Sequence, residues 1–357
     1  EIAQCLVGSE MCIRDRLLAA GMIAQTALST GGVVQVQAAE DTYVKTDELT
    51  DNDTAAPKKD SVIPSKNQYE YQKQELAAFC HFGMNTYTGS EWGNGKENPN
   101  QFQLTNDFDE ETYVKAIHDA GFKKLIITAK HHDGFCIWPS EMTTHDTETA
   151  GYEGDVLEEL SRACTKYNID MGLYLSPWDV NSEYYGYKDK DGKKLVGADG
   201  QPLNGKTWDQ VKQEDTLDYN EYYDNQLKEI LGNDKYGNNG HFKEVWMDGA
   251  KDTNDKSNAQ DYDFQRWFKT IQQYEGKASG KYEDDCLLFG AESYTTVRWI
   301  GNERGYAAEE TWAKSTIDRE NNTINSNSRD GYTKGFPNGN QWTVPEADTK
   351  ITSGWFW

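Results

Sequence analysis

The feature that most constrains the fold of this chain is an alternation of continuous apolar runs with amphipathic stretches from about residue 68 onward. The runs expected as strands are residues 76–84, 124–130, 170–176, 244–249 and 286–292. The stretches expected as helices are residues 109–122, 155–169, 218–231 and 263–275. Strands that are apolar on both faces are typical of a parallel sheet covered by helices, so the pattern predicts an α/β fold.

Polar side chains recur where the expected strands end, at His81, His131, His132, Tyr174, Asp248 and Glu292. In an open, doubly wound sheet these residues would lie along an edge. In a barrel, the C-terminal ends of parallel strands converge on one mouth, where active sites are built. We therefore expect a (β/α)8-like barrel of the TIM type. No G-x-G-x-x-G or P-loop pattern lies between a strand and a helix to compete with this interpretation.

The charge balance indicates which partners to expect. Sixty acidic residues against 36 basic ones give a net charge of −24, which repels nucleic acid and anionic membrane surfaces. Eleven Trp and 21 Tyr favour aromatic surfaces that meet a sugar ring, although aromatic residues also serve ordinary packing. A neutral, hydroxylated partner therefore fits this composition best.

The N-terminal region divides into three parts. Residues 1–16 fit neither a signal nor a domain and look like an artefact, whereas residues 17–39 have the order of a secretory signal, too short and too polar for a membrane span. Residues 40–67 are expected to be a disordered lead-in, and residues 68–357 the catalytic domain. We expect export to the medium or the cell surface. Cys80 and Cys136 are expected as buried free thiols.

Asp248 is the first candidate for chemistry. It ends an apolar strand and lies two residues after Trp246, which places both side chains on the same face of that strand. A helix N-cap or a loop ion pair is the alternative interpretation. If the strand persists, the adjacent His131 and His132 point to opposite sides of the chain, so that one can face the barrel axis while the other braces a neighbouring loop.

Two loops add further candidates. The loop GSEWGNGKENP carries Glu91 and Trp92, a carboxylate for hydroxyls and an indole for an apolar ring face, although it also fits a purely structural loop. The loop RWIGNERGYAAEETW carries Glu303 between two glycines. Spacing alone does not choose between Glu303 and its neighbours Glu292, Glu309 and Glu310. No H-x-H pair occurs, so we predict no metal site, and a zinc hydrolase is the weaker alternative.

Five segments together resemble glycoside hydrolase family 29, the retaining α-L-fucosidases, and in particular its α-1,3/1,4-specific subfamily. They are FCHFGMNTYTGSEWGNGKENP, FKKLIITAKHHDGFCIWPS, MGLYLSPWD, EVWMDGA and VRWIGNERGYA. The resemblance implies that Asp248 is the nucleophile and Glu303 the general acid/base. It also implies a fucose pocket lined by His81, Glu91, Trp92, His131, His132, Tyr174 and Trp246.

The resemblance further implies double displacement on fucosylated oligosaccharides or glycoconjugates of the Lewis type, with no cofactor. Family members continue beyond the point where this chain stops, so we expect a barrel truncated before its last strand and lacking the C-terminal β-sandwich. Three alternatives stay open: an α-L-fucosidase of broad specificity, a non-catalytic fucose-binding protein and a metal-dependent hydrolase.

Overall fold

The computed structural model describes residues 62–105, 108–249, 260–275, 286–325 and 328–356, within one unit that begins at Val62. The predicted leader over residues 1–39, and residues 40–61 of the predicted lead-in, lie outside the described residues. The first helix, α2 (Lys66–Gln74), begins two residues before the predicted domain boundary at residue 68. Ser65 and Gln68 form a capping box that starts this helix inside a polar stretch.

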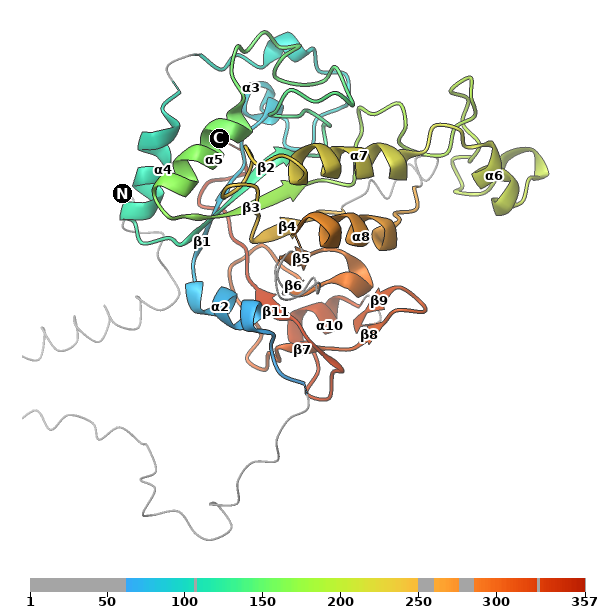
Figure 1. Ribbon diagram of the computed structural model, residues 1–357. Coiled ribbons are helices and arrows are strands. Elements are labelled where there is room, and N and C mark those ends of the chain that lie inside the picture. The colour runs from blue at the N-terminus through green and yellow to red at the C-terminus, as the bar shows by residue number, and fades with distance from the viewer. Residues whose placement is uncertain (1–61, 106–107, 250–259, 276–285, 326–327, 357) are drawn as a thin grey trace, which may run out of the picture. The chain divides into compact units, whose positions relative to one another are not determined.

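A curled sheet of seven parallel strands organises the fold, in the order β1-β2-β3-β4-β5-β6-β11 (Figure 1). The strands are β1 (Ala77–Cys80), β2 (Lys124–Lys130), β3 (Asp170–Leu175), β4 (Glu244–Trp246), β5 (Leu287–Phe289), β6 (Val297–Trp299) and β11 (Val344–Glu346). Every pairing between neighbours in this sheet is parallel. The sheet forms a half-barrel that fits a (β/α)8-like domain.

Helices between successive strands cover the outer face of the sheet (Figure 1). They are α4 (Glu110–Asp119), α5 (Val156–Lys166), α7 (Tyr219–Leu231) and α8 (Phe264–Glu275). Asp109, Asp155 and Asp218 cap the first three, because each carboxylate accepts the N–H of the residue three positions on. The five strands and four helices expected from the sequence are confirmed, with ends shifted by up to four residues.

The strands alternate between two apolar cores. Leu125, Leu173, Val245 and Leu288 pack outward with the helices. Ile126, Tyr174, Trp246 and Phe289, each one position further along its strand, pack inside the curl. Because both faces are buried, the strands read as continuous apolar runs in the sequence, as the prediction assumed.

Shorter elements complete the domain. They are α3 (Met84–Thr88), η3 (Pro99–Gln101), η4 (Leu203–Gly205), α6 (Trp208–Glu214), η6 (Glu292–Tyr294), β7 (Lys314–Ser315), β8 (Ile317–Asp318), β9 (Thr323–Ile324), α10 (Arg329–Lys334) and β10 (Gln341–Trp342). The segment around α6 projects from the body of the domain, at the right of Figure 1. Strands β6 and β11 were not predicted, since each has only three residues and no apolar run. None of the helices in the described ranges is long and apolar enough to cross a lipid bilayer.

Helix α2 closes the foot of the half-barrel, at the N-terminal ends of most of its strands. The Gln68 side-chain amide donates to the carbonyl oxygens of Thr296 (3.1 Å) and Trp342 (3.0 Å). The Tyr71 hydroxyl donates to Glu244 Oε2 (2.9 Å), beside the buried Lys124. This end of the sheet is therefore filled by protein side chains.

Candidate active site

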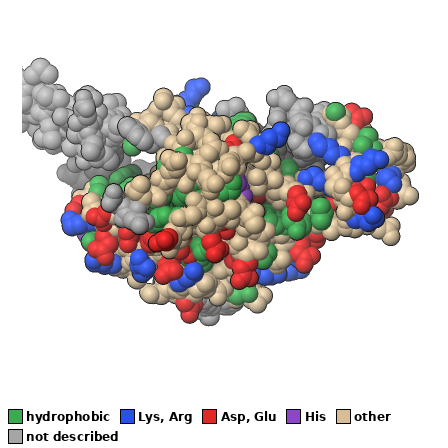
Figure 2. Space-filling view, turned by 90° about the horizontal axis from the view of Figure 1, so that it is seen from above, with side chains coloured by type: hydrophobic (Ala, Val, Ile, Leu, Met, Phe, Trp, Pro, Cys, Tyr) green, Lys and Arg blue, Asp and Glu red, His purple; other side chains and the backbone are tan. Residues whose placement is uncertain are grey.

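A cavity of about 360 Å³ lies at the other end of the sheet and contains all nine residues predicted for the site. These are His81, Glu91, Trp92, His131, His132, Tyr174, Trp246, Asp248 and Glu303. In the view from above, a small area of histidine surface is visible between hydrophobic side chains near the middle of the face (Figure 2). The topology brings these residues together because parallel strands deliver their C-terminal ends to one mouth.

A continuous stack of rings crosses the interior beneath this cavity. His131 lies parallel to Tyr174, with 5.4 Å between ring centroids and an 8° interplanar angle. Tyr174 stacks on Trp246 (5.2 Å, 17°), and Trp246 stacks on Phe289 (3.7 Å, 10°). The four residues come from neighbouring strands β2 to β5 or the residue just beyond, so the sheet itself aligns an apolar surface suited to a ring-shaped ligand.

The histidines of the cavity offer hydrogen bonds that the protein does not use. Burial lowers the pKa of His81 to about 3 and the pKa of His131 well below its usual value, so both rings are neutral. The Nδ1 atoms of His81 and His131 are buried and have no hydrogen-bond partner in the structure. A neutral imidazole presents one donor and one acceptor, which matches a sugar hydroxyl.

His131 and His132 were expected on opposite sides of the chain only if their strand persisted, and it does not. Strand β2 ends at Lys130, and the chain then turns, with the Gly134 N–H donating to the His131 carbonyl (3.0 Å). The two rings consequently lie with centroids 4.1 Å apart, and both line the cavity. His132 Nδ1 is 2.7 Å from Ser176 Oγ, and its Nε2 is 3.6 Å from Asp248 Oδ2.

Asp248 lies two residues beyond the end of β4, with one third of its side chain exposed to the cavity. The Tyr174 hydroxyl donates to Asp248 Oδ2 over 3.1 Å, and the Ser176 hydroxyl contacts the Asp248 carbonyl oxygen at 3.3 Å. These contacts fix the carboxylate from the neighbouring strand. A carboxylate held in this way, and open to the cavity, is placed to meet a ligand atom directly.

Glu303 lines the same cavity, whereas its rival Glu292 is not among the lining residues. Glu303 Oε2 accepts a hydrogen bond from Trp355 Nε1 (3.2 Å) and lies 3.6 Å from Lys350 Nζ. The loop is anchored where the Gly305 N–H donates to the Asp348 carbonyl (3.1 Å). Glu292 instead begins η6 and accepts a hydrogen bond from Asn322.

The lining residues that were missed from the sequence include Trp355, Asp348 and Trp299. Trp355 stacks on His81 with centroids 4.9 Å apart, and Trp299 Nε1 donates to Asp348 Oδ1 (3.0 Å). Burial raises the pKa of Asp348 to about 6, the Trp299 hydrogen bond opposes this rise, and Glu346 and Glu303 reinforce it. The run of aromatic residues in the segment SGWFW was the one sequence signal that could have placed Trp355 in the site. This segment was used only to mark the end of the chain.

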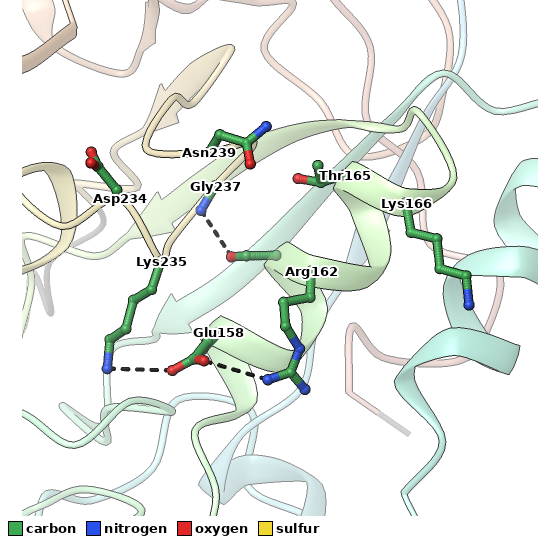
Figure 3. Close-up of a pocket in the computed structure, with 9 residues that line it drawn as sticks. Glu158, Arg162, Thr165, Lys166, Asp234, Lys235, Gly237 and Asn239 are labelled. Carbon is green, nitrogen blue, oxygen red and sulfur yellow. Dashed lines mark hydrogen bonds and ion pairs between the residues drawn. The ribbon is translucent and has the colours of Figure 1, made fainter.

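A second cavity lies on the flank of the domain, between α5 and residues 234–239 (Figure 3). Its basic side chains already have acidic partners: Lys235 pairs with Glu158 (3.6 Å), and Arg162 also pairs with Glu158 (3.4 Å). Lys166 pairs with Glu111. This cavity has few groups to offer a ligand, so we assign the site to the mouth of the sheet. Among the described residues, no group of three or more His, Cys, Asp or Glu side chains is placed to hold a metal ion.

A half-barrel whose mouth is lined by several carboxylates above an aromatic floor is typical of the carbohydrate-active barrel proteins. The alpha-L-fucosidase family model matches residues 42–321, and the chain belongs to this family. It is 37% identical to Alpha-L-fucosidase 1 of Arabidopsis thaliana over 298 residues, which cover 83% of this chain and 50% of the relative. The chain thus spans about half the length of the curated relatives that it matches over most of its own length.

Solved structures agree with this assignment. A Ruminococcus gnavus glycoside hydrolase family 29 fucosidase, solved in complex with fucose, shares 60% identity with a TM-score of 0.75, over 85% of this chain and 58% of that chain. A glycoside hydrolase family 29 member from an unknown rumen bacterium shares 30% identity with a TM-score of 0.62, over 83% of this chain and 47% of that chain. The family resemblance found in the sequence is confirmed; its subfamily stays a prediction.

Proposed function

We propose that this chain is the catalytic part of a retaining exo-α-L-fucosidase. One observation carries the proposal: four carboxylates, those of Glu91, Asp248, Glu303 and Asp348, line a single cavity with an aromatic floor, together with two neutral imidazoles whose Nδ1 atoms have no partner among the described residues. The imidazoles and Glu91 suit the hydroxyls of a deoxy sugar, and the stacked rings suit its apolar face. The fucose complex of the related Ruminococcus gnavus enzyme supports this choice of sugar.

In the proposed reaction, the Asp248 carboxylate attacks the anomeric carbon while Glu303 protonates the leaving oxygen. Glu303 then removes a proton from water, which attacks the fucosyl ester, and the configuration is retained. Tyr174 and His132 hold the Asp248 carboxylate through the phenol and imidazole contacts described above. Trp355 and Lys350 hold Glu303 at the rim.

The preferred substrate that we propose is terminal fucose in α-1,3 or α-1,4 linkage on Lewis-type glycans. The loop that contains Glu91 and Trp92 and the segment LSPWD both match the linkage-restricted subfamily. A broad-specificity α-L-fucosidase is the second candidate. It is favoured if kcat/KM on 2′-linked fucose equals kcat/KM on Lewis trisaccharides. We also propose export of the protein, on the basis of the leader-like residues 17–39.

The decisive experiment is turnover of an aryl α-L-fucoside followed by NMR, with and without a chelator. Release of α-L-fucose as the first product, insensitive to the chelator, is expected. First release of the β anomer would rule out the retaining mechanism. Binding of fucose without turnover would favour a fucose-binding protein, and loss of activity with the chelator would favour a metal-dependent hydrolase.

The acid/base assignment needs a separate comparison. The variant Glu303→Ala should lose about 10²- to 10⁴-fold in kcat/KM on Lewis glycans, yet keep much of the first step on an activated aryl fucoside, which needs no proton. Azide should restore its turnover and yield the α-fucosyl azide. Glu292→Ala is the matched control and should behave like the unmodified chain. The reverse pattern would transfer the role to Glu292.

A further inference from the structure

A cluster of buried polar groups lies behind the cavity, where the loop over residues 89–98 meets the turn over residues 131–134. We call these segments the 89–98 loop and the histidine turn. Asp133, Asn85 and Glu97 are 1%, 1% and 7% exposed. Each has one buried oxygen atom that lacks a hydrogen-bond partner within the described part of the chain: Asp133 Oδ2, Asn85 Oδ1 and Glu97 Oε2. Three buried acceptors without a donor would be costly unless one of them carried a proton.

The orientation of Asn85 is fixed by its other contacts. Its Nδ2 donates to the carbonyl oxygens of Ser90 (2.8 Å) and Glu91 (3.0 Å), which uses both of its hydrogens. Its Oδ1 therefore stays an acceptor, and rotating the amide group would break two hydrogen bonds. Asn85 thus holds the main chain of Glu91, whose carboxylate faces the cavity.

The loop backbone packs directly on Asp133. A Cβ atom at Gly93 would lie 2.6 Å from Asp133 Cβ and 3.1 Å from Glu97 Oε1, so the two acidic side chains meet at one point of the loop. Gly93 also has a φ of +71°, which favours glycine. Asp133 Oδ1 accepts the Phe135 N–H (2.7 Å), and the Asn94 N–H donates to Glu97 Oε1 (2.6 Å). The second carboxylate oxygens, Asp133 Oδ2 and Glu97 Oε2, are buried and have no donor among the described residues.

We propose that Asp133, Asn85 and Glu97 fasten the 89–98 loop to the histidine turn through a proton shared among their buried oxygen atoms. The loop delivers Glu91 and Trp92 to the cavity, where Trp92 packs edge-on against Trp178 (5.3 Å between centroids). Asp133 immediately follows His132. It is a positioning residue, since it does not line the cavity itself. This inference rests on the proposed function, because its catalytic consequence passes through Glu91 and Trp92.

The electrostatic surroundings keep the proton on Asp133. Burial raises the pKa of Asp133 to about 8, Glu97 and Asp179 add to this rise, and the Phe135 N–H opposes it. Asp179 is paired with Lys130 (3.2 Å), so that cation is already engaged. The buried imidazole of His145 faces the Asp133 main chain, and burial lowers its pKa, so it adds no positive charge at neutral pH.

The sign of the pH dependence follows. The pKa of Asp133 is about 8 in the folded chain and about 3.9 when unfolded, so the group stabilises the fold at low pH. That stabilisation is lost as the pH rises from about 4 to about 8. Above pH 8 the charged carboxylate faces Glu97 without a proton between them, and the 89–98 loop should loosen.

The test compares Asp133→Asn, which copies the neutral acid and carries a donor, with Asp133→Ala. At pH 7, D133N should keep kcat and KM on an aryl fucoside within about threefold, whereas D133A should raise KM at least tenfold with a smaller effect on kcat. Above pH 8, KM should rise for the unmodified chain but not for D133N. The proposal fails if D133N is as impaired as D133A, or if KM follows the same pH profile in D133N and the unmodified chain.

A stability measurement separates this inference from the proposed function. The melting temperature of D133N minus that of the unmodified chain should grow from pH 4 to pH 8 and then stay constant, whether or not the chain hydrolyses fucosides. Asp179→Asn is the matched control: its carboxylate accepts from Lys130, Asn181 and Ser182, so loss of its charge should lower the melting temperature at pH 7. If the difference in melting temperature between D133N and the unmodified chain did not change from pH 4 to pH 8, the proposal of a shared proton would be wrong. Dependence of KM on added Ca²⁺ would also contradict it, because that would mean that a cation joins these oxygens.

Discussion

The foot and the mouth of the half-barrel both bury charged and polar groups but treat them differently. At the foot, Lys124 Nζ lies 2.8 Å from Glu244 Oε2 and 3.4 Å from the centroid of the Tyr71 ring, so the cation has partners on two sides. At the mouth, the Nδ1 atoms of His81 and His131 have no partner among the residues that the structure describes. The foot pairs its buried cation and joins α2 to the sheet, although Glu244 Oε1 and Gln74 Oε1 there have no partner among the described residues. The unpaired atoms at the mouth are instead ring nitrogens of residues that line the cavity, where a ligand can bond them.

This comparison indicates that different residues determine the stability and the activity of the domain. Groups left unpaired in a buried site lower the stability of a fold, and functional sites commonly accept that cost. Changes at the mouth should therefore remove activity with little loss of stability. Changes at the foot should do the reverse. Four predictions test this division, from the largest expected effect to the smallest.

The largest effect is expected at the mouth, for Asp248→Ala. Loss of the nucleophile should reduce turnover by about four orders of magnitude or more, whatever the leaving group. The melting temperature should change little, since one third of the side chain is exposed. Added azide should enter the vacated space and give the β-fucosyl azide, detected by NMR. A variant that keeps appreciable turnover without azide would remove Asp248 from the role of nucleophile.

The second effect is expected at the foot, for Lys124→Met. Removing the cation leaves the buried Glu244 without its main partner, so the free energy of unfolding should fall by about 3–5 kcal/mol in urea titrations. kcat/KM of the folded fraction at low temperature should be preserved. Lys73→Met, which removes an exposed pair with Glu70, is the matched control and should leave stability unchanged. Equal stability of the two variants would contradict the division between foot and mouth.

The third effect is a pair of opposite pH dependences. Burial lowers the pKa of His81 to about 3. Between about pH 6.5 and pH 3 the His81 imidazole is therefore protonated in the unfolded chain but neutral in the folded chain. Stability should fall as the pH drops from about 6.5 toward 3, by about 2 kcal/mol at pH 5, and His81→Phe should remove that contribution.

At the foot, burial and the neighbouring Glu346 raise the pKa of Glu244 to about 7, against Lys124. Stability from this group is present below about pH 4.5 and is lost as the pH rises to about 7. Glu244→Gln should therefore reduce the loss of stability over that interval. Melting curves of both variants from pH 4 to pH 8 check the two signs, and the same sign for both would contradict this account.

The smallest effect is expected for His131→Phe. The ring keeps its stack on Tyr174 but can no longer bond a hydroxyl, so fucose should bind about 3- to 10-fold more weakly by calorimetry. The melting temperature should stay the same or rise, because the imidazole has an unpaired buried nitrogen. Tyr236→Phe provides a contrast. Its hydroxyl is bonded to Asp155 (2.8 Å) away from the cavity, so stability should fall and binding should not.

The sequence predicted the strands with long apolar runs and the residues at their ends. Strand β2 has the predicted bounds, and all nine predicted site residues reached the same cavity. Short strands such as β6 and β11 were missed because three residues carry no periodicity. The relation between His131 and His132 could not be predicted, because it depended on whether the strand continued past Lys130, where it ends.

What the sequence determined by itself was the alternation of buried strands and covering helices, and thereby the edge of the sheet at which polar residues collect. Those properties follow from local periodicity and from the geometry of parallel strands. Only the tertiary structure decided that Glu303 rather than Glu292 reaches the cavity, that Trp355 stacks on His81, and that Asp133 meets Glu97 beneath the 89–98 loop. These contacts join residues far apart in the chain, and their positions depend on how loops pack against one another, which no local pattern encodes.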